Sequence, residues 1–173
     1  MTIKRYLLVV AFILLAYCNA LAGGVGTWKN YLSYSDVQWV EEGSNKLYVL
    51  ASNSLYTYNK NDQSIKTYDK VNGLSDTDIR FIAWNKTARR LVIIYSNNNI
   101  DLLDDRGNVT NVPDYYLKTT MVEKTVNGID MSGVYCYLST GFGLVKLNVA
   151  KAEISDSYNL SFPKNVQKLS VIT

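Results

Sequence analysis

The chain has 173 residues, of which 47% are hydrophobic and 19% charged, with a formal net charge of +3 and no histidine. This length supports one domain with a hydrophobic core, and the hydrophobic content excludes a disordered chain. Without histidine, the Ser-His-Asp triad, the Cys-His pair and histidine-containing zinc sites are excluded in their usual forms. The 14 tyrosines favour strands over helices.

The N-terminal segment is typical of a signal peptide. Lys4 and Arg5 precede an apolar run over residues 6–18, which is shorter than the roughly 20 residues that a membrane-spanning helix needs. The small residues in the Ala-Leu-Ala sequence at 20–22 then indicate a cleavage site. We therefore expect residues 1–22 to be removed on export, which leaves no transmembrane span.

Lipid attachment at Cys18 is the alternative, but the bulky Tyr17 stands where a lipoprotein signal has a small residue. Conventional cleavage also removes two basic residues and no acidic one, so the mature chain is nearly neutral. The longest basic run that remains is Arg89-Arg90, so we expect no nucleic-acid partner. Cys136 then stands alone in a strand-like segment, where a buried apolar role is favoured over a reactive thiol.

The rest of the chain repeats a four-strand unit with a period of about 44 residues. Residues 47–52 match residues 91–96 and 134–139, and each match is followed by a turn rich in Asn, Ser or Gly. The first unit is expected to have strands at 37–40, 47–52 and 55–58 and a fourth strand that begins at 65. The second unit has them at 79–84, 91–96 and 100–103, with the fourth from 109. The third unit has them at 126–131, 134–139 and 144–147, with the fourth from 154.

Both faces of each expected sheet are apolar, since Leu47 and Val49 alternate with Tyr48 and Leu50. A sheet with two apolar faces must be packed between neighbours, and radial stacking of such sheets gives a β-propeller with about 40–50 residues in each blade. An immunoglobulin-like sandwich is disfavoured because it does not repeat one four-strand pattern. No segment after the signal shows sustained helical periodicity.

The predicted fold class is therefore all-β, a partial β-propeller. Its blades are expected at about 35–70, 77–113 and 125–159, and a fourth begins at about 166. Because propellers close with about four to eight blades, we expect residues 23–173 to be an incomplete N-terminal propeller domain of a longer protein.

Two sets of motifs carry a family resemblance. Residues 72–76 (Asn-Gly-Leu-Ser-Asp) and 140–148 resemble blade motifs of two-component-regulator propellers. More narrowly, residues 28–34, 95–102 and 138–144, the last continuing to residues 153–154, resemble the N-terminal propeller of the PorZ family, cell-surface components of the type IX secretion system of Bacteroidetes. The residues that carry these motifs are Trp28, Gly73, Leu74, Ser96, Asn97, Asn99, Ile100, Asp101, Ser139, Gly141, Phe142 and Gly143.

The resemblance implies a non-catalytic scaffold that is exported to the periplasm or the outer-membrane cell surface. It also implies partners among the secretion-system proteins, including a sortase-like subunit, with lipopolysaccharide or an oligosaccharide as ligand, and no cofactor. The first alternative is the periplasmic sensor propeller of a hybrid two-component regulator that binds an oligosaccharide. A propeller-type lyase or glycosidase is a third and less favoured hypothesis.

No catalytic or metal-binding residue is predicted. Asp101, Asp104 and Asp105 cluster near one hairpin, where acids at a strand end commonly cap the turn. Asp101 lies within the strand, and alternation could direct it into a central channel, so it is one binding candidate.

The aromatic residues provide the other candidate. Trp28 precedes the first complete unit, so it is the second binding candidate, because aromatic faces suit sugar rings and hydrophobic anchors. Trp39 and Trp84 are expected to pack between blades instead.

Overall fold

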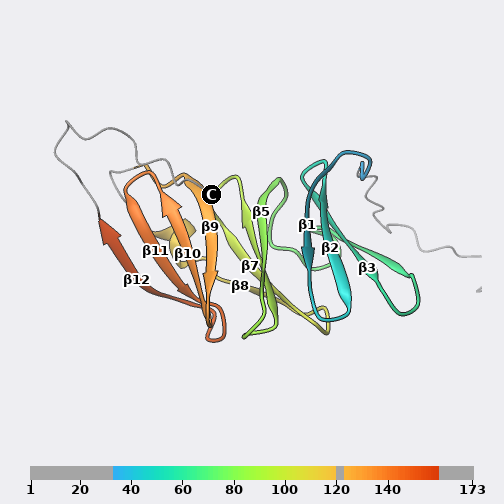
Figure 1. Ribbon diagram of the computed structural model, residues 1–173. Helices are drawn as coiled ribbons and strands as arrows, with labels where there is room; N and C mark the ends of the chain where they lie inside the picture. The colour runs from blue at the N-terminus through green and yellow to red at the C-terminus, as the bar shows by residue number, and fades with distance from the viewer. Residues whose placement is uncertain (1–32, 120–122, 160–173) are drawn as a thin grey trace, which may run out of the picture. The chain divides into compact units, whose positions relative to one another are not determined.

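The structure, a computed structural model, describes residues 33–119 and 123–159. The expected signal peptide, Trp28 and the expected start of a fourth unit at 166 lie outside these residues. Within them the chain forms three four-stranded antiparallel sheets (Figure 1), which confirms the predicted all-β class and the partial propeller. The strands are β1 (Val37–Glu42), β2 (Lys46–Ala51), β3 (Ser54–Asn59), β4 (Ile65–Tyr68), β5 (Ile79–Asn85), β6 (Arg90–Tyr95), β7 (Ile100–Asp104), β8 (Val109–Asn111), β9 (Val126–Ser132), β10 (Tyr135–Thr140), β11 (Gly143–Asn148) and β12 (Glu153–Asn159).

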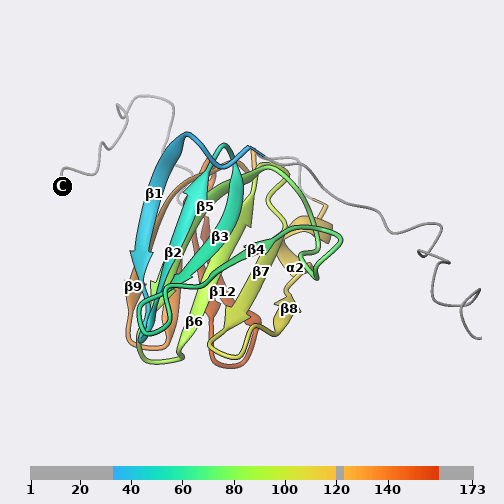
Figure 2. The same ribbon diagram turned by 90° about the vertical axis from the view of Figure 1, so that its right-hand side faces the viewer.

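Each sheet follows chain order, so that β1 to β4, β5 to β8 and β9 to β12 are successive neighbours (Figures 1 and 2). The turns between second and third strands use residues that tolerate a left-handed backbone. Ser52 and Asn53 have φ values of 48° and 59°, and Asn98 has 68°. The Asn- and Ser-rich turns that the sequence predicts are therefore present where the hairpins need them.

The core consists of two hydrophobic clusters, one on each side of the second sheet. Along β6, Leu91 and Ile93 join a cluster with Tyr48 of β2, whereas Val92 and Ile94 join a cluster with residues of the third sheet. All four β6 residues are fully buried. Because burying each such side chain contributes about 1.5–3 kcal/mol, the second sheet is held by its two neighbours, as its two apolar faces predict.

The first strands of the sheets lie beside one another, since β5 contacts both β1 and β9. The Trp84 ring stacks on that of Tyr48 with centroids 5.2 Å apart and an interplanar angle of 20°, so its predicted packing between blades is confirmed. The same prediction is wrong for Trp39, which is 51% exposed. Its indole N–H donates to Glu41 Oε1 at 2.8 Å, and the Trp84 backbone N–H donates to Oε2 at 3.1 Å. Glu41 thus holds Trp39 at the sheet edge.

One helical turn, α2 (Asp114–Leu117), lies between the second and third sheets in the sequence and was not predicted. Four residues are too few to show helical periodicity. Pro113 stands at its N-cap with φ −79°, and Tyr115 is buried in the second hydrophobic cluster. In the described part of the chain, no helix is long and apolar enough to cross a membrane.

Candidate interaction site

The side chain of Asp101 on β7 is fully buried. Its carboxylate accepts hydrogen bonds from the Ser75 backbone N–H at 2.7 Å, the Tyr95 hydroxyl at 2.6 Å and Asn111 Nδ2 at 2.8 Å. Burial, and then the hydrogen bond to Asp101, raise the pKa of Tyr95, so its hydroxyl remains a donor. The expectation that Asp101 faces a central channel is wrong, because these three donors hold it within the protein. Its binding role stays a prediction.

The Asn-Gly-Leu-Ser motif lies in the loop between β4 and β5 and determines its conformation. The backbone N–H groups of Asn72 and Leu74 both donate to the Asp69 carbonyl at 3.0 Å. Gly73 has a φ of +112°, which side chains rarely allow, and Leu74 is buried in the first cluster. The motif therefore shapes a tight loop that brings Ser75 against the buried carboxylate.

The turn between β6 and β7 is built by asparagine side chains. Asn97 donates from Nδ2 to Asp76 and accepts the Asn99 backbone N–H at 2.9 Å. Asn99 is buried, and its Oδ1 accepts the Ile100 backbone N–H and Asn111 Nδ2, both at 3.0 Å. The family-motif residues of this turn thus satisfy the polar groups of the backbone and of one another.

The same backbone link recurs in all three sheets. In each, the turn after the second strand donates an N–H to the carbonyl just before the first strand. These bonds run from Ser52 to Asp36, Ser96 to Asp78 and Gly141 to Thr125, at 2.8, 3.0 and 3.1 Å. The turns also reach the next sheet, because the Ile79 N–H donates to the Asn53 carbonyl and the Val126 N–H donates to Asn98 Oδ1. We call this set of linked turns and first-strand loops the loop end.

In the third sheet, two glycines of the motif are required by their surroundings. A Cβ on Gly141 would lie 2.8 Å from the Glu123 carbonyl oxygen, so no side chain fits there. Gly143 has a φ of +152°, and its carbonyl accepts the Thr140 hydroxyl at 2.8 Å. Ser139 is half-buried on β10. The motif residues therefore meet at the loop end.

Of the other acids near the β7–β8 hairpin, Asp104 caps the turn as predicted, whereas Asp105 forms an ion pair instead. Asp104 accepts the backbone N–H groups of Arg106 at 2.9 Å and Asn108 at 2.8 Å and so caps the turn. Asp105 pairs with Arg89 at 2.6 Å on the surface. Across residues 33–119 and 123–159, no group of three or more His, Cys, Asp or Glu side chains could hold a metal ion.

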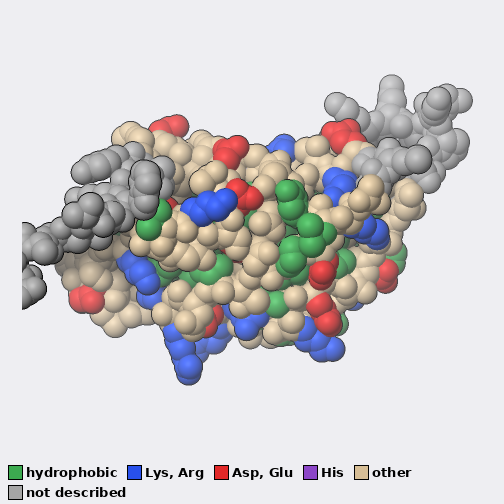
Figure 3. All heavy atoms as spheres, turned by 180° about the vertical axis from the view of Figure 1, so that it is seen from behind, with side chains coloured by type: hydrophobic (Ala, Val, Ile, Leu, Met, Phe, Trp, Pro, Cys, Tyr) green, Lys and Arg blue, Asp and Glu red, His purple; other side chains and the backbone are tan. Residues whose placement is uncertain are grey.

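In Figure 3, basic side chains are scattered and hydrophobic ones gather in the right half.

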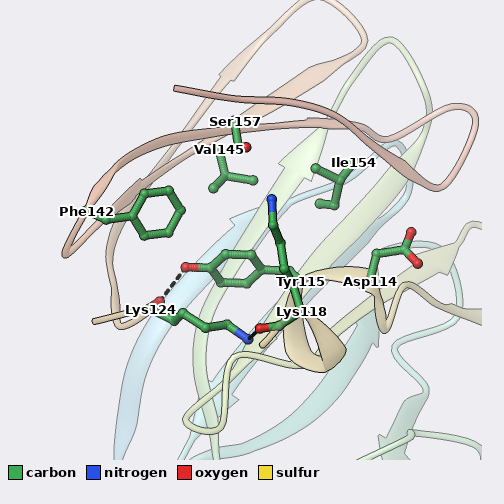
Figure 4. A pocket seen from close by; sticks show the side chains of 8 residues that line it. All are labelled: Asp114, Tyr115, Lys118, Lys124, Phe142, Val145, Ile154 and Ser157. Atoms are coloured by element: carbon green, nitrogen blue, oxygen red, sulfur yellow. Dashed lines mark hydrogen bonds between the residues drawn. The ribbon is translucent and has the colours of Figure 1, made fainter. Parts of the chain in front are cut away.

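A cavity of about 250 Å³ lies between α2 and the third sheet (Figure 4). The sequence does not predict this cavity, because one wall depends on a helical turn too short to show helical periodicity. Its walls come from α2, the segment before β9, the β10–β11 turn and the last two strands. The lining residues are Asp114, Tyr115, Lys118, Lys124, Phe142, Val145, Ile154 and Ser157.

Lys124 fixes one wall of this cavity. Its Nζ donates to the carbonyls of Tyr116 at 2.9 Å and Lys118 at 2.7 Å, which satisfies the C-terminal end of α2. The Tyr115 hydroxyl in turn donates to the Lys124 carbonyl (Figure 4). Burial, and then repulsion by the Lys118 ammonium, lower the pKa of Lys124.

Cys136 is fully buried in the second hydrophobic cluster, which confirms its predicted apolar role. Burial, and then the negative charge of Asp130, raise the pKa of its thiol. We expect alkylation of Cys136 to be at least about 100-fold slower in the native protein than in urea, because the thiolate is the reactive form and the thiol must first be exposed. Mass spectrometry of the C18S variant, in which Cys136 is the remaining thiol, measures this rate. Rapid stoichiometric labelling of the native protein would contradict it.

These observations define the class of protein: successive four-stranded sheets, packed face to face with their first strands adjacent, form part of a β-propeller. A family profile described as "TSS9, PorZ, N-terminal beta-propeller domain" matches residues 47–173. The chain belongs to this family of PorZ N-terminal propellers, as its motifs predict.

Comparison with solved structures agrees. PorZ of Porphyromonas gingivalis, described as an essential bacterial surface component of the type-IX secretion system, is 36% identical with a TM-score of 0.72. The match covers 77% of this chain and only 18% of that structure, so the chain spans less than a fifth of its length. A search of curated protein sequences found no match.

More distant structures share the fold alone. The extracellular domain of the one-component system BT4673 from B. thetaiotaomicron is 17% identical with a TM-score of 0.57, covering 78% of this chain and 18% of that one. AztD from Citrobacter koseri is 15% identical with a TM-score of 0.56, and the match covers 79% of this chain and 36% of that one.

Proposed function

We propose that this chain is a non-catalytic interaction module of type IX secretion, exported through the signal peptide at residues 1–22. The observation that carries the proposal is membership of the PorZ N-terminal propeller family. Its partners would be other secretion proteins, including a sortase-like subunit, and its ligand a lipopolysaccharide or oligosaccharide. The place of action is the periplasm or the outer-membrane surface. The expected blades at 35–70, 77–113 and 125–159 form the body of this module within residues 23–173.

The chemistry of the described residues supports binding rather than catalysis. The Asp101 carboxylate is enclosed by three donors, the Cys136 thiol is buried, and the loop-end asparagines are bonded to their own backbone. The hydrogen bonds of the asparagines hold the loop-end turn in one conformation, and a preorganised surface loses less conformational entropy on binding a partner.

Gene disruption in the bacterium that encodes the chain tests this proposal. Cargo of the type IX system should disappear from the cell surface and medium and accumulate in the periplasm, because an assembly component is missing. Immunoblots of fractionated cells measure this, and an outer-membrane protein exported by another route serves as control. Restoring the gene should restore secretion.

The sensor hypothesis gives a different result. Normal cargo secretion, together with loss of a transcriptional response to an added oligosaccharide, would contradict the secretion role and favour the sensor. The distant extracellular-domain structures share the fold with this chain but do not by themselves favour that function.

A further inference from the structure

The cavity beside α2 combines an apolar wall with the positive charge of the exposed Lys118 residue. Val145 is buried, and Phe142 and Ile154 are partly buried against the second cluster, so they give the cavity a hydrophobic side. Figure 4 shows the Phe142 ring, Val145 and Ile154 around the space into which the Lys118 amine extends. An apolar body and one charged group are therefore accommodated together.

The Lys118 ammonium makes no ion pair with any described carboxylate. Asp114, the one acid among the described residues that line the cavity, points away from the Lys118 amine in Figure 4. Lys124 is committed to the carbonyl groups at the end of α2 and lies 5.3 Å from the centroid of the Tyr115 ring. Two ammonium groups thus border the cavity, and an anion placed there would lessen their mutual repulsion.

We propose that this cavity binds a small amphipathic monocarboxylate whose apolar body lies against Val145 and Ile154 and whose carboxylate pairs with Lys118. The hydroxyl of Ser157 at the rim provides a donor for the second carboxylate oxygen. This site adjoins the loop end through the β10–β11 turn, and it does not depend on the proposed role in secretion.

The volume limits the size of the ligand. At about 250 Å³, the cavity is slightly smaller than the roughly 300–1,000 Å³ of most ligand pockets. It suits an acid with one aromatic ring or a short branched chain, and it is too small for an oligosaccharide or a full lipid chain. Phenylacetate is therefore an appropriate first compound.

Titration of the isotope-labelled chain, followed by amide chemical shifts, tests this site. Phenylacetate should give saturable shifts that centre on the amides of Val145, Ile154 and Ser157. Phenylacetamide and phenethylamine, which keep the ring and lack the negative charge, should bind at least about tenfold more weakly, because they cannot form the ion pair.

Two variants and one control make the test specific. The K118Q variant should weaken phenylacetate binding about tenfold, and S157F should abolish it by filling the rim. K151Q removes an exposed lysine that faces Glu153 elsewhere on the third sheet, so it should leave binding unchanged. Absence of saturable binding, equal binding of phenylacetamide, or unchanged affinity in K118Q would each overturn the proposal.

Discussion

Replacing Asp101 with alanine is expected to lower the free energy of unfolding by about 2–4 kcal/mol, because buried donors that lose their acceptor each cost about 1–3 kcal/mol. The Tyr95 hydroxyl is fully buried with no other acceptor in the described hydrogen bonds, and the Ser75 N–H is partly buried. Asn111 is nearer to solvent and can turn to water. Urea unfolding followed by tryptophan fluorescence measures the difference.

The D105A variant is the matched control. Asp105 is one residue beyond the same strand and pairs with Arg89 on the surface, so its loss should cost less than about 1 kcal/mol. The double variant D101A/Y95F should be less destabilised than the sum of its single variants, since Y95F removes a donor that D101A leaves unpaired. Equal stability of D101A and D105A would show that the buried network contributes little.

Truncating Trp84 is expected to have the largest effect, about 3–5 kcal/mol, because W84A removes an aromatic ring from the contact between two sheets. Trp84 is 6% exposed and stacks on Tyr48 of the neighbouring sheet. Thermal unfolding followed by circular dichroism measures the loss without relying on tryptophan emission.

Trp39 offers a comparison of the same residue type in another first strand. W39A removes a ring that is half exposed, so it should change stability by less than about 1 kcal/mol. A W39A variant as unstable as W84A would mean that Trp39 is covered in the protein in solution.

The strand pattern could be predicted because each repeat carries its own local signals. In β2 and β6, apolar side chains occupy consecutive positions, and turn-forming residues such as Asn53 and Asn98 follow within a few residues. Because the strand pattern recurs about every 44 residues, architectures without an internal repeat are excluded. Because successive residues of a strand point to opposite faces, these apolar runs also predicted burial on both faces of the second sheet.

The burial of individual side chains, and the residues from other segments that contact them, could not be predicted in the same way. Alternation places Asp101 on one face of β7, but it does not reveal that Ser75 and Asn111 close over that position. It likewise cannot distinguish Trp39 from Trp84, because exposure depends on which sheet lies opposite. The cavity could not be predicted for a related reason. One of its walls is formed by α2, and a single helical turn is too short to show a periodic pattern in the sequence.

The unequal connections between the sheets suggest how such a repeat diversifies. The segment from 69 to 78 is held tightly by hydrogen bonds to Asp69, whereas the longer segment from 112 to 125 contains α2, anchored in the core through Tyr115. Insertions in that second connection would leave the strand registers unchanged. It is therefore a position where duplicated blades can acquire individual surface chemistry at little cost to folding.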